Sequence, residues 1–167
     1  MATQQISYGA YQAMTVTALQ SLANDSSDPF GAWQSDRVDN RSTLAVDYEI
    51  RIHLPTANTA PANDSAAYVY LVPWVHDGTS WAAGGNFGTT TLPTGSEGSA
   101  SISEPNSMKR ALTLPYKIAQ QILNGWISIQ QLLGIVPDGW SLAIRNCTGA
   151  ALSTGCVVEY RPVFYTV

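Results

Sequence analysis

Residues 137–167 read PDGWSLAIRNCTGAALSTGCVVEYRPVFYTV, and this stretch decides the fold class. Apolar side chains occupy every second position in two parts of it: Trp140, Leu142 and Ile144, then Val158, Tyr160 and Phe164. That period is typical of a strand with one buried face. Small, glycine-flanked residues separate the two parts, as in a connection. The stretch therefore predicts two β-strands, and the rest of the chain is expected to be built around this final pair.

The same period recurs along the chain. Its clearest instance is residues 44–54, where one side carries Leu44, Val46, Tyr48, Ile50, Ile52 and Leu54 and the other carries alternating charge. Further strands are predicted at residues 13–22, 66–76, 111–118 and 120–127, with a short one at 89–91. Pro73 removes a ladder donor and predicts an edge or a bulge. Asp77-Gly78 predicts a tight hairpin.

The remaining segments are predicted to be loops, apart from one helical turn. Loops are expected at residues 24–40, 55–65 and 82–101 and a turn at 104–106, and the turn of helix at 128–133 ends at Gly134. About eight or nine short strands at spacings of roughly ten residues are typical of a sandwich or barrel. The fold predicted is all-β, a jelly-roll-like antiparallel β-sandwich with one short helical turn. Residues 1–11 form an N-terminal arm or edge strand, and residues 12–167 a single β-sandwich domain.

Composition narrows the classes of function. Charged residues make up 12% of the chain, about half the usual share of ~25%. Such a surface repels neighbours weakly and suits packing against other subunits. The net charge is −4 and no basic run occurs, so a nucleic-acid partner is not expected. No apolar run approaches ~18 residues and no signal-peptide pattern opens the chain, so neither a membrane span nor secretion is expected.

The two cysteines, Cys147 and Cys156, are predicted to be free thiols. If their strands form a hairpin with both apolar faces inward, the two side chains point to opposite faces and a disulfide is geometrically difficult. Two cysteines alone do not make a zinc site.

No motif for catalysis, a cofactor or a metal is recognised, so the chain is not expected to be an enzyme. Four aspartates in the predicted loop raise the alternative of a calcium site, although their spacing does not match an EF-hand: Asp25, Asp28, Asp36 and Asp39. The simpler interpretation is solvated turn carboxylates. His53 and His76 are interpreted as strand-end residues without a catalytic role.

Five tryptophans suggest a further alternative. Trp33 and Trp81 lie in or beside predicted loops and are candidates for stacking on sugar rings or for a subunit interface. Trp140 begins a core-facing segment and is expected in the interior.

The two final segments, Pro-Asp-Gly-Trp-Ser-Leu-Ala-Ile-Arg-Asn-Cys-Thr-Gly-Ala-Ala-Leu and Val-Val-Glu-Tyr-Arg-Pro-Val-Phe-Tyr-Thr-Val, resemble the C-terminal strands of small structural proteins of tailed-bacteriophage particles. In those proteins a proline precedes an aromatic-led strand, an Asn-x-Thr/Ser-Gly turn follows, and tyrosines mark the last strand. The resemblance includes residues 124–134 and points to capsid decoration (cement) proteins, which commonly have jelly-roll-like folds.

This resemblance implies a non-enzymatic virion protein that binds the major capsid protein as a homodimer or homotrimer and is assembled in the host cytoplasm. Residues 1–11 would then clamp a neighbouring subunit through Gln4, Gln5, Ile6, Tyr8 and Tyr11. Two alternatives stay open. One is a glycan-binding jelly-roll module for host recognition, and the other is a tail or connector component present at low copy number.

Overall fold

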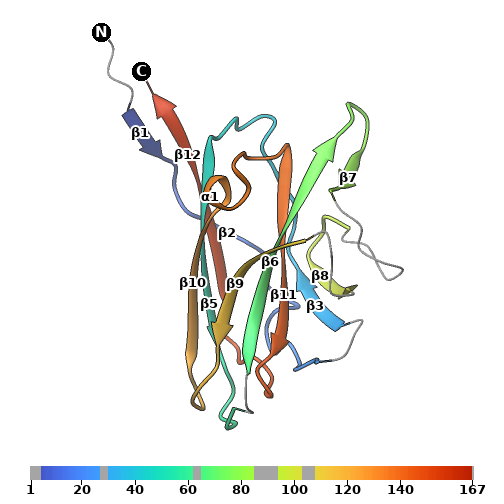
Figure 1. Cartoon of the computed structure of the whole chain (residues 1–167), viewed down its shortest axis with the longest axis vertical. Coiled ribbons are helices and arrows are strands. Elements are labelled where there is room, and N and C mark those ends of the chain that lie inside the picture. Colours follow the sequence, from blue (N-terminus) through green and yellow to red (C-terminus); the bar gives the residue numbers. More distant parts are fainter. Residues whose placement is uncertain (1–4, 27–29, 62–64, 85–93, 103–107, 167) are drawn as a thin grey trace.

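The computed structural model describes residues 5–26, 30–61, 65–84, 94–102 and 108–166. Its strands form two curled antiparallel sheets that face each other (Figure 1). The five-stranded sheet contains β1 (Gln5–Tyr8), β2 (Gln12–Ala13), β5 (Asp47–Pro55), β10 (Ile122–Ser128) and β12 (Val157–Thr166). The seven-stranded sheet contains β3 (Phe30–Gln34), β4 (Val38–Asp39), β6 (Ala66–His76), β7 (Trp81–Ala83), β8 (Gly98–Ile102), β9 (Lys109–Pro115) and β11 (Gly139–Cys147).

The predicted all-β sandwich is confirmed. Strand order is β1-β12-β5-β10 in one sheet and β7-β6-β11-β3-β8 in the other. The connections β4–β5, β5–β6, β9–β10, β10–β11 and β11–β12 each pass from one sheet to the other. This alternation is what a jelly-roll-like arrangement requires.

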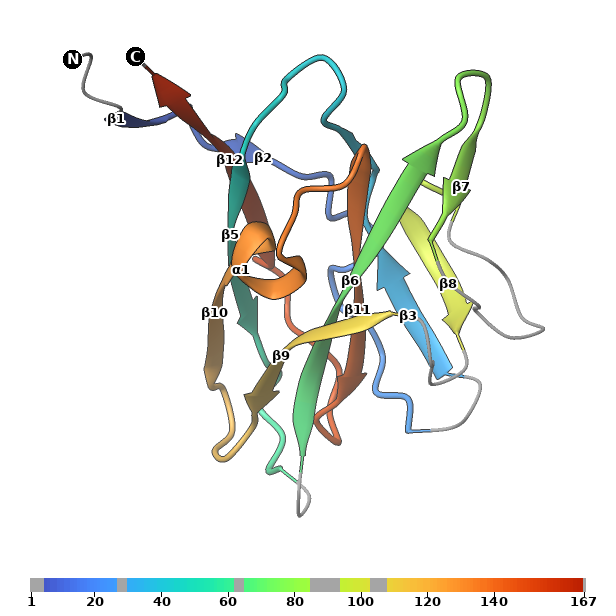
Figure 2. The ribbon, with the colours of Figure 1, turned by 45° about the horizontal axis from the view of Figure 1, so that its top comes forward.

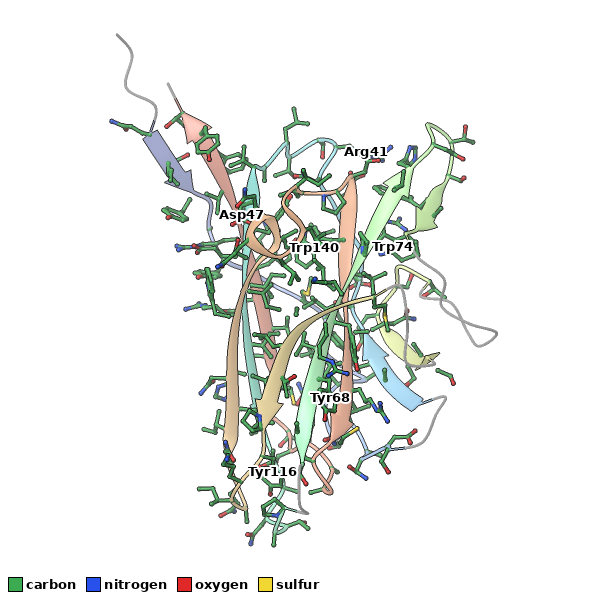
Figure 3. All side chains as sticks on the ribbon, viewed as in Figure 1. Arg41, Asp47, Tyr68, Trp74, Tyr116 and Trp140 are labelled. Atoms are coloured by element: carbon green, nitrogen blue, oxygen red, sulfur yellow. The ribbon has the colours of Figure 1, made fainter. Side chains whose placement is uncertain are left out.

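The last two strands do not form the hairpin considered for the two cysteines, because β11 and β12 lie in opposite sheets. The side chain of Asn146 donates to the carbonyls of Leu22 and Ala150 and so holds the connection across the end of the sandwich. The two strands instead meet through the core, where the rings of Trp140 and Tyr160 are 5.3 Å apart, edge to face. Figure 3 shows Trp140 between the sheets.

Cys147 and Cys156 are free thiols, as predicted. Cys156 is buried, and this burial raises the pKa of its thiol to about 11.

Strand β5 confirms most of the alternation predicted for residues 44–54. Tyr48, Ile50, Ile52 and Leu54 are buried in the core. Leu44 does not belong to the strand, because its backbone has a φ of 51° and its side chain is 72% exposed. The strand begins only at Asp47.

The predicted strand at residues 13–22 is also wrong beyond Ala13, where β2 ends. The amides of Leu19 and Gln20 both donate to the Val16 carbonyl, which makes a turn. The turn buries Leu19 completely, and the Ala18 amide donates to the Glu97 carboxylate at 2.7 Å.

The predicted loop at residues 24–40 contains two strands, β3 and β4, which sequence reasoning missed. In β3, Trp33 belongs to the core between the sheets, whereas Ala32 belongs to a second buried cluster on the other face of the seven-stranded sheet. Because both faces are covered, β3 carries no apolar–polar alternation.

Strand β6 has the predicted bounds. Pro73 lies where β6 changes its partner, because β9 pairs with it up to Leu71 and β7 from Trp74. The Pro73 carbonyl accepts from the Gly84 amide on the side of β6 where β9 and β7 pair. The N–H that Pro73 lacks would point to the same side, between the end of β9 and the start of β7, so no ladder hydrogen bond is lost. The hairpin at Asp77-Gly78 is confirmed.

Strand β9 begins and ends earlier than predicted, and β8 occupies part of the region predicted as a loop. The strand predicted at 89–91 and the turn at 104–106 lie outside the described residues. The helical turn is confirmed as α1 (Ile129–Leu133), capped by the Ser128 hydroxyl and ended by Gly134 at a φ of 81°. Asp47 lies beside its start and accepts from Ser128 and from the Gln130 amide (Figure 3).

Candidate functional site

Strand β1 and the end of β12 form a two-stranded ribbon that extends beyond the body of the sandwich (Figures 1 and 2). We call β1 together with residues 163–166 the terminal ribbon. Strand β5 pairs with β12 only as far as Val163, so Phe164, Tyr165 and Thr166 pair with β1 alone. The predicted arm is therefore an edge strand of the five-stranded sheet over residues 5–8.

One face of the terminal ribbon is apolar and open to solvent. Ile6 lies directly opposite Tyr165, and Tyr8 opposite Val163, so these side chains share the outer face of the sheet. Ile6, Tyr8 and Tyr165 are 58%, 52% and 56% exposed. Leu44, Val75, Ile118 and Ile135 are about as exposed or more so, but none of these four lies opposite another large apolar side chain in the described strands.

The outer edge of β1 presents backbone groups that pair with no other described strand. The Gly9 amide donates to the Pro162 carbonyl at 2.8 Å, in step with the β1–β12 register. In an antiparallel ladder the residues that exchange bonds alternate, so Ser7 faces β12 while the N–H and C=O groups of Ile6 and Tyr8 point away from it. Among the described residues no strand pairs with this edge.

The base of the terminal ribbon is fixed to the sheet by aromatic and ionic contacts. The Arg161 guanidinium lies 4.2 Å from the ring centroid of Tyr8 and 4.8 Å from that of Tyr11, and Arg51 lies 3.7 Å from Tyr11. Arg161 also donates to Glu49 at 2.6 Å, and this bond raises the pKa of Arg161. Tyr8 and Tyr11 thus have positions set by the sheet and not by the arm alone.

The residues predicted for partner contact come together here. Gln5 and Ile6 are exposed in β1, Tyr8 is at its end, and Tyr11 lies half-buried at the base. Gln4 lies outside the described residues. Sequence reasoning did not identify Tyr165 as a contact residue. Its position two residues after Val163 in the final strand could have placed both side chains on one face.

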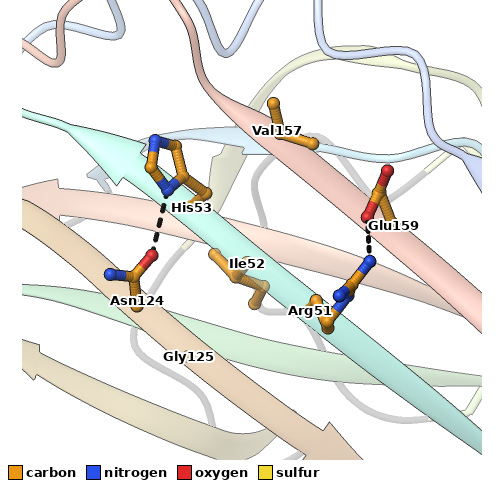
Figure 4. A pocket seen from close by; sticks show the side chains of 7 residues that line it. All are labelled: Arg51, Ile52, His53, Asn124, Gly125, Val157 and Glu159. Carbon is orange, nitrogen blue, oxygen red and sulfur yellow. Dashed lines mark hydrogen bonds and ion pairs between the residues drawn. The ribbon is translucent and has the colours of Figure 1, made fainter.

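A shallow hollow of about 470 Å³ lies further down the same outer face. Two polar pairs flank it, as Figure 4 shows: Arg51 donates to Glu159 at 2.8 Å, and His53 Nδ1 lies 3.0 Å from Asn124 Oδ1. Ile52, Gly125 and Val157 complete the lining. Trp126 on β10 is 49% exposed and lies directly opposite Arg51 on β5.

The two tryptophans singled out from the sequence are elsewhere. Trp33 is in β3, not in a loop, and is 0% exposed with its Nε1 donating to Glu97 at 2.9 Å, so its ring offers no face for stacking. Trp81 is half-buried in β7, with the guanidinium groups of Arg37 and Arg41 at 4.3 and 4.6 Å from its ring. Burial lowers the pKa of Arg37.

The acidic and histidine residues are dispersed. Within the part of the chain that is described, no three His, Cys, Asp or Glu side chains are grouped as around a metal ion. Asp25 and Asp39 instead accept local hydrogen bonds from Gly31 and Arg41, and Asp28 is outside the described residues. Among those residues, no helix is long and apolar enough to cross a bilayer.

Comparison with protein-family models, curated proteins and solved structures found no match to this chain. The resemblance of residues 124–167 to bacteriophage structural proteins therefore stays a prediction. The geometry of the terminal ribbon and of the hollow supplies the basis for the functional proposals.

Proposed function

We propose that this chain is a non-enzymatic structural protein of a virion, of the capsid decoration type, which binds the major capsid protein and reinforces the shell. The observation that carries the proposal is the terminal ribbon, whose exposed Ile6, Tyr8 and Tyr165 share one face beside a strand edge that no other described strand covers. An exposed apolar surface next to free backbone donors and acceptors favours addition of another chain.

The ribbon suits a lattice better than a single strong contact. Covering each of its three half-exposed side chains stabilises a complex by about 1 kcal/mol, before the entropy cost of association. One such contact is weak by itself. On a shell, several contacts act together and the effective concentration of neighbours is high, so weak contacts give stable occupancy.

The test compares occupancy on particles of the virus that encodes the chain. We expect Ile6→Asp and Tyr165→Asp to lower the number of copies per particle at least tenfold, measured by quantitative mass spectrometry against the major capsid protein. Ile118→Asp is the matched control, since Ile118 is 66% exposed and belongs to the turn between β9 and β10. That turn lies at the opposite end of the sandwich from the terminal ribbon (Figure 1). Circular dichroism checks that all three variants are folded.

Absence of the chain from purified particles would refute the decoration function, and unchanged occupancy of both variants would refute the part assigned to the terminal ribbon. A wild-type copy number far below that of the capsid protein would instead favour the tail or connector alternative.

A second candidate function is glycan binding, and the hollow is the observation that favours it. The Arg51 and Glu159 charges at its rim are paired with each other, its size is within the ~300–1,000 Å³ of small-molecule sites, and the exposed Trp126 lies opposite Arg51. These features suit a neutral sugar. The side chain that would stack on the sugar ring is then Trp126, in place of Trp33 and Trp81. Saturation-transfer NMR with a panel of neutral oligosaccharides tests it: binding must be lost in Trp126→Ala and kept in Trp81→Ala.

A further inference from the structure

We propose that β1 pairs with β1 of a second copy of this chain about a two-fold axis, so that two five-stranded sheets join into one continuous antiparallel sheet. This inference rests on the proposed function, because it identifies the first neighbour of the terminal ribbon. It specifies the edge, the register and the residue on the axis.

The backbone fixes the register. Ile6 and Tyr8 are the residues of β1 whose N–H and C=O groups point to the open edge. If the axis passes beside Ser7, Ile6 of one copy lies opposite Tyr8 of the other, and these two residues exchange both of their hydrogen bonds. Ser7 then lies opposite its own counterpart in the non-hydrogen-bonded pair, with Cα atoms ~4.5 Å apart.

The chemistry of the edge suits a copy of itself. No charged side chain occurs before Asp25 or after Arg161, so two such edges meet without like-charge repulsion. Natural edge strands are usually protected by charge, proline or a bulge, and residues 5–8 have none of these. Arg161, the nearest cation, is already bonded to Glu49.

The same axis also completes the apolar surface. A two-fold axis perpendicular to the sheet keeps the outer faces of both copies on one side. Ile6 and Tyr8 of each copy then lie next to those of the other, and the two half-exposed patches form one strip. A four-residue strand buries much less than the ~1,200 Å² of a stable complex, so we expect a weak dimer that the shell stabilises.

Disulfide trapping tests the register. Two cysteines at position 7 would have a Cα separation within the ~4.4–6.8 Å that a disulfide accepts. Ser7→Cys is prepared in a Cys147→Ser background, which removes the less buried native thiol. The matched control is Ser101→Cys in the same background, because Ser101 is a half-buried serine on β8, the outer strand of the other sheet.

We expect mild oxidation to convert Ser7→Cys into a covalent dimer at least tenfold faster than Ser101→Cys, on non-reducing gels. Adding Ile6→Pro should abolish this, because Pro removes an N–H that points to the open edge and leaves the β12 ladder intact. Circular dichroism confirms folding of each variant. Equal rates for the two cysteines, or trapping that Ile6→Pro does not reduce, would overturn the inference.

The two proposals fail separately. Trapping without occupancy on particles refutes the decoration function and keeps the dimer. Occupancy that depends on Ile6 without trapping refutes the dimer, and the ribbon then binds the capsid protein directly.

Discussion

Trp33 and Trp140 allow a matched test of what a buried indole N–H contributes to stability. Both side chains are 0% exposed in the core between the sheets. The Nε1 of Trp33 donates to the Glu97 carboxylate at 2.9 Å, whereas the Nε1 of Trp140 has no hydrogen-bond partner among the described residues. Replacing each by Phe removes a similar volume but a different polar interaction.

The expected magnitudes follow from that difference. We take the lost packing as about 2 kcal/mol at either site, roughly half the cost of Trp→Ala. At Trp33 the lost bond to a carboxylate adds about 1.5 kcal/mol, the low value because Glu97 is half-buried. At Trp140 removal of an unsatisfied donor returns about 1–3 kcal/mol. Trp33→Phe should therefore cost about 3.5 kcal/mol, and Trp140→Phe between about −1 and +1 kcal/mol.

Urea unfolding followed by circular dichroism measures both free energies of unfolding, with equal m-values as the check that each transition is two-state. In thermal scans Trp33→Phe should lower Tm by roughly 7–14 °C, and Trp140→Phe by a few degrees at most. If Trp140→Phe destabilises the protein as much as Trp33→Phe, the Trp140 N–H is satisfied in solution and the reasoning is refuted.

Three further predictions concern single groups. Asp77 has a pKa lowered to about 2, chiefly by a hydrogen bond from the Ser80 amide and then by one from Thr79, so its contribution to stability is present above its unfolded pKa of 3.8 and is lost as pH falls toward 2. Asp77→Asn should flatten the fall of Tm between those pH values, and an unchanged slope would contradict this. Burial raises the pKa of Cys156 to about 11, so at pH 8 a thiol reagent should modify it only after unfolding, detectable by mass spectrometry. Gly134→Ala should lower the free energy of unfolding by about 1 kcal/mol, because Gly134 has a φ of 81°, and a neutral result would show that the helix end can rearrange.

The sequence predicted best those strands that have one face in the core and one in solvent. In β5, buried Ile50 and Ile52 alternate with the polar Glu49, Arg51 and His53. The end of α1 was equally clear, because the Gly134 stop acts locally. These signals depend on neighbours within a few residues and therefore survive without knowledge of the fold.

Features set by distant parts of the chain were not predictable in this way. Strand β3 has Ala32 and Trp33 buried on opposite faces, so the contrast between alternate positions disappears. The strands β11 and β12 lie in different sheets, and the side chain of Asn146 at the end of β11 donates to Leu22, which is far away in sequence. At the site, predicting that Ile6 and Tyr8 are exposed on one face would have required the register between β1 and β12. Predicting that Trp126 is exposed would have required knowing that β10 is an edge strand paired only with β5 in its sheet.

The β1–β12 ladder joins Gln5 to Thr166, which are 161 residues apart. During synthesis, β1 has no intramolecular partner until almost all of the described chain has emerged, and closing so long a loop is slow. An uncharged strand left unpaired for that time can form intermolecular aggregates. Productive folding of this protein therefore depends on how soon β12 reaches β1, and a lower concentration of newly made chains, which reduces encounters between unpaired β1 strands, should raise its soluble yield.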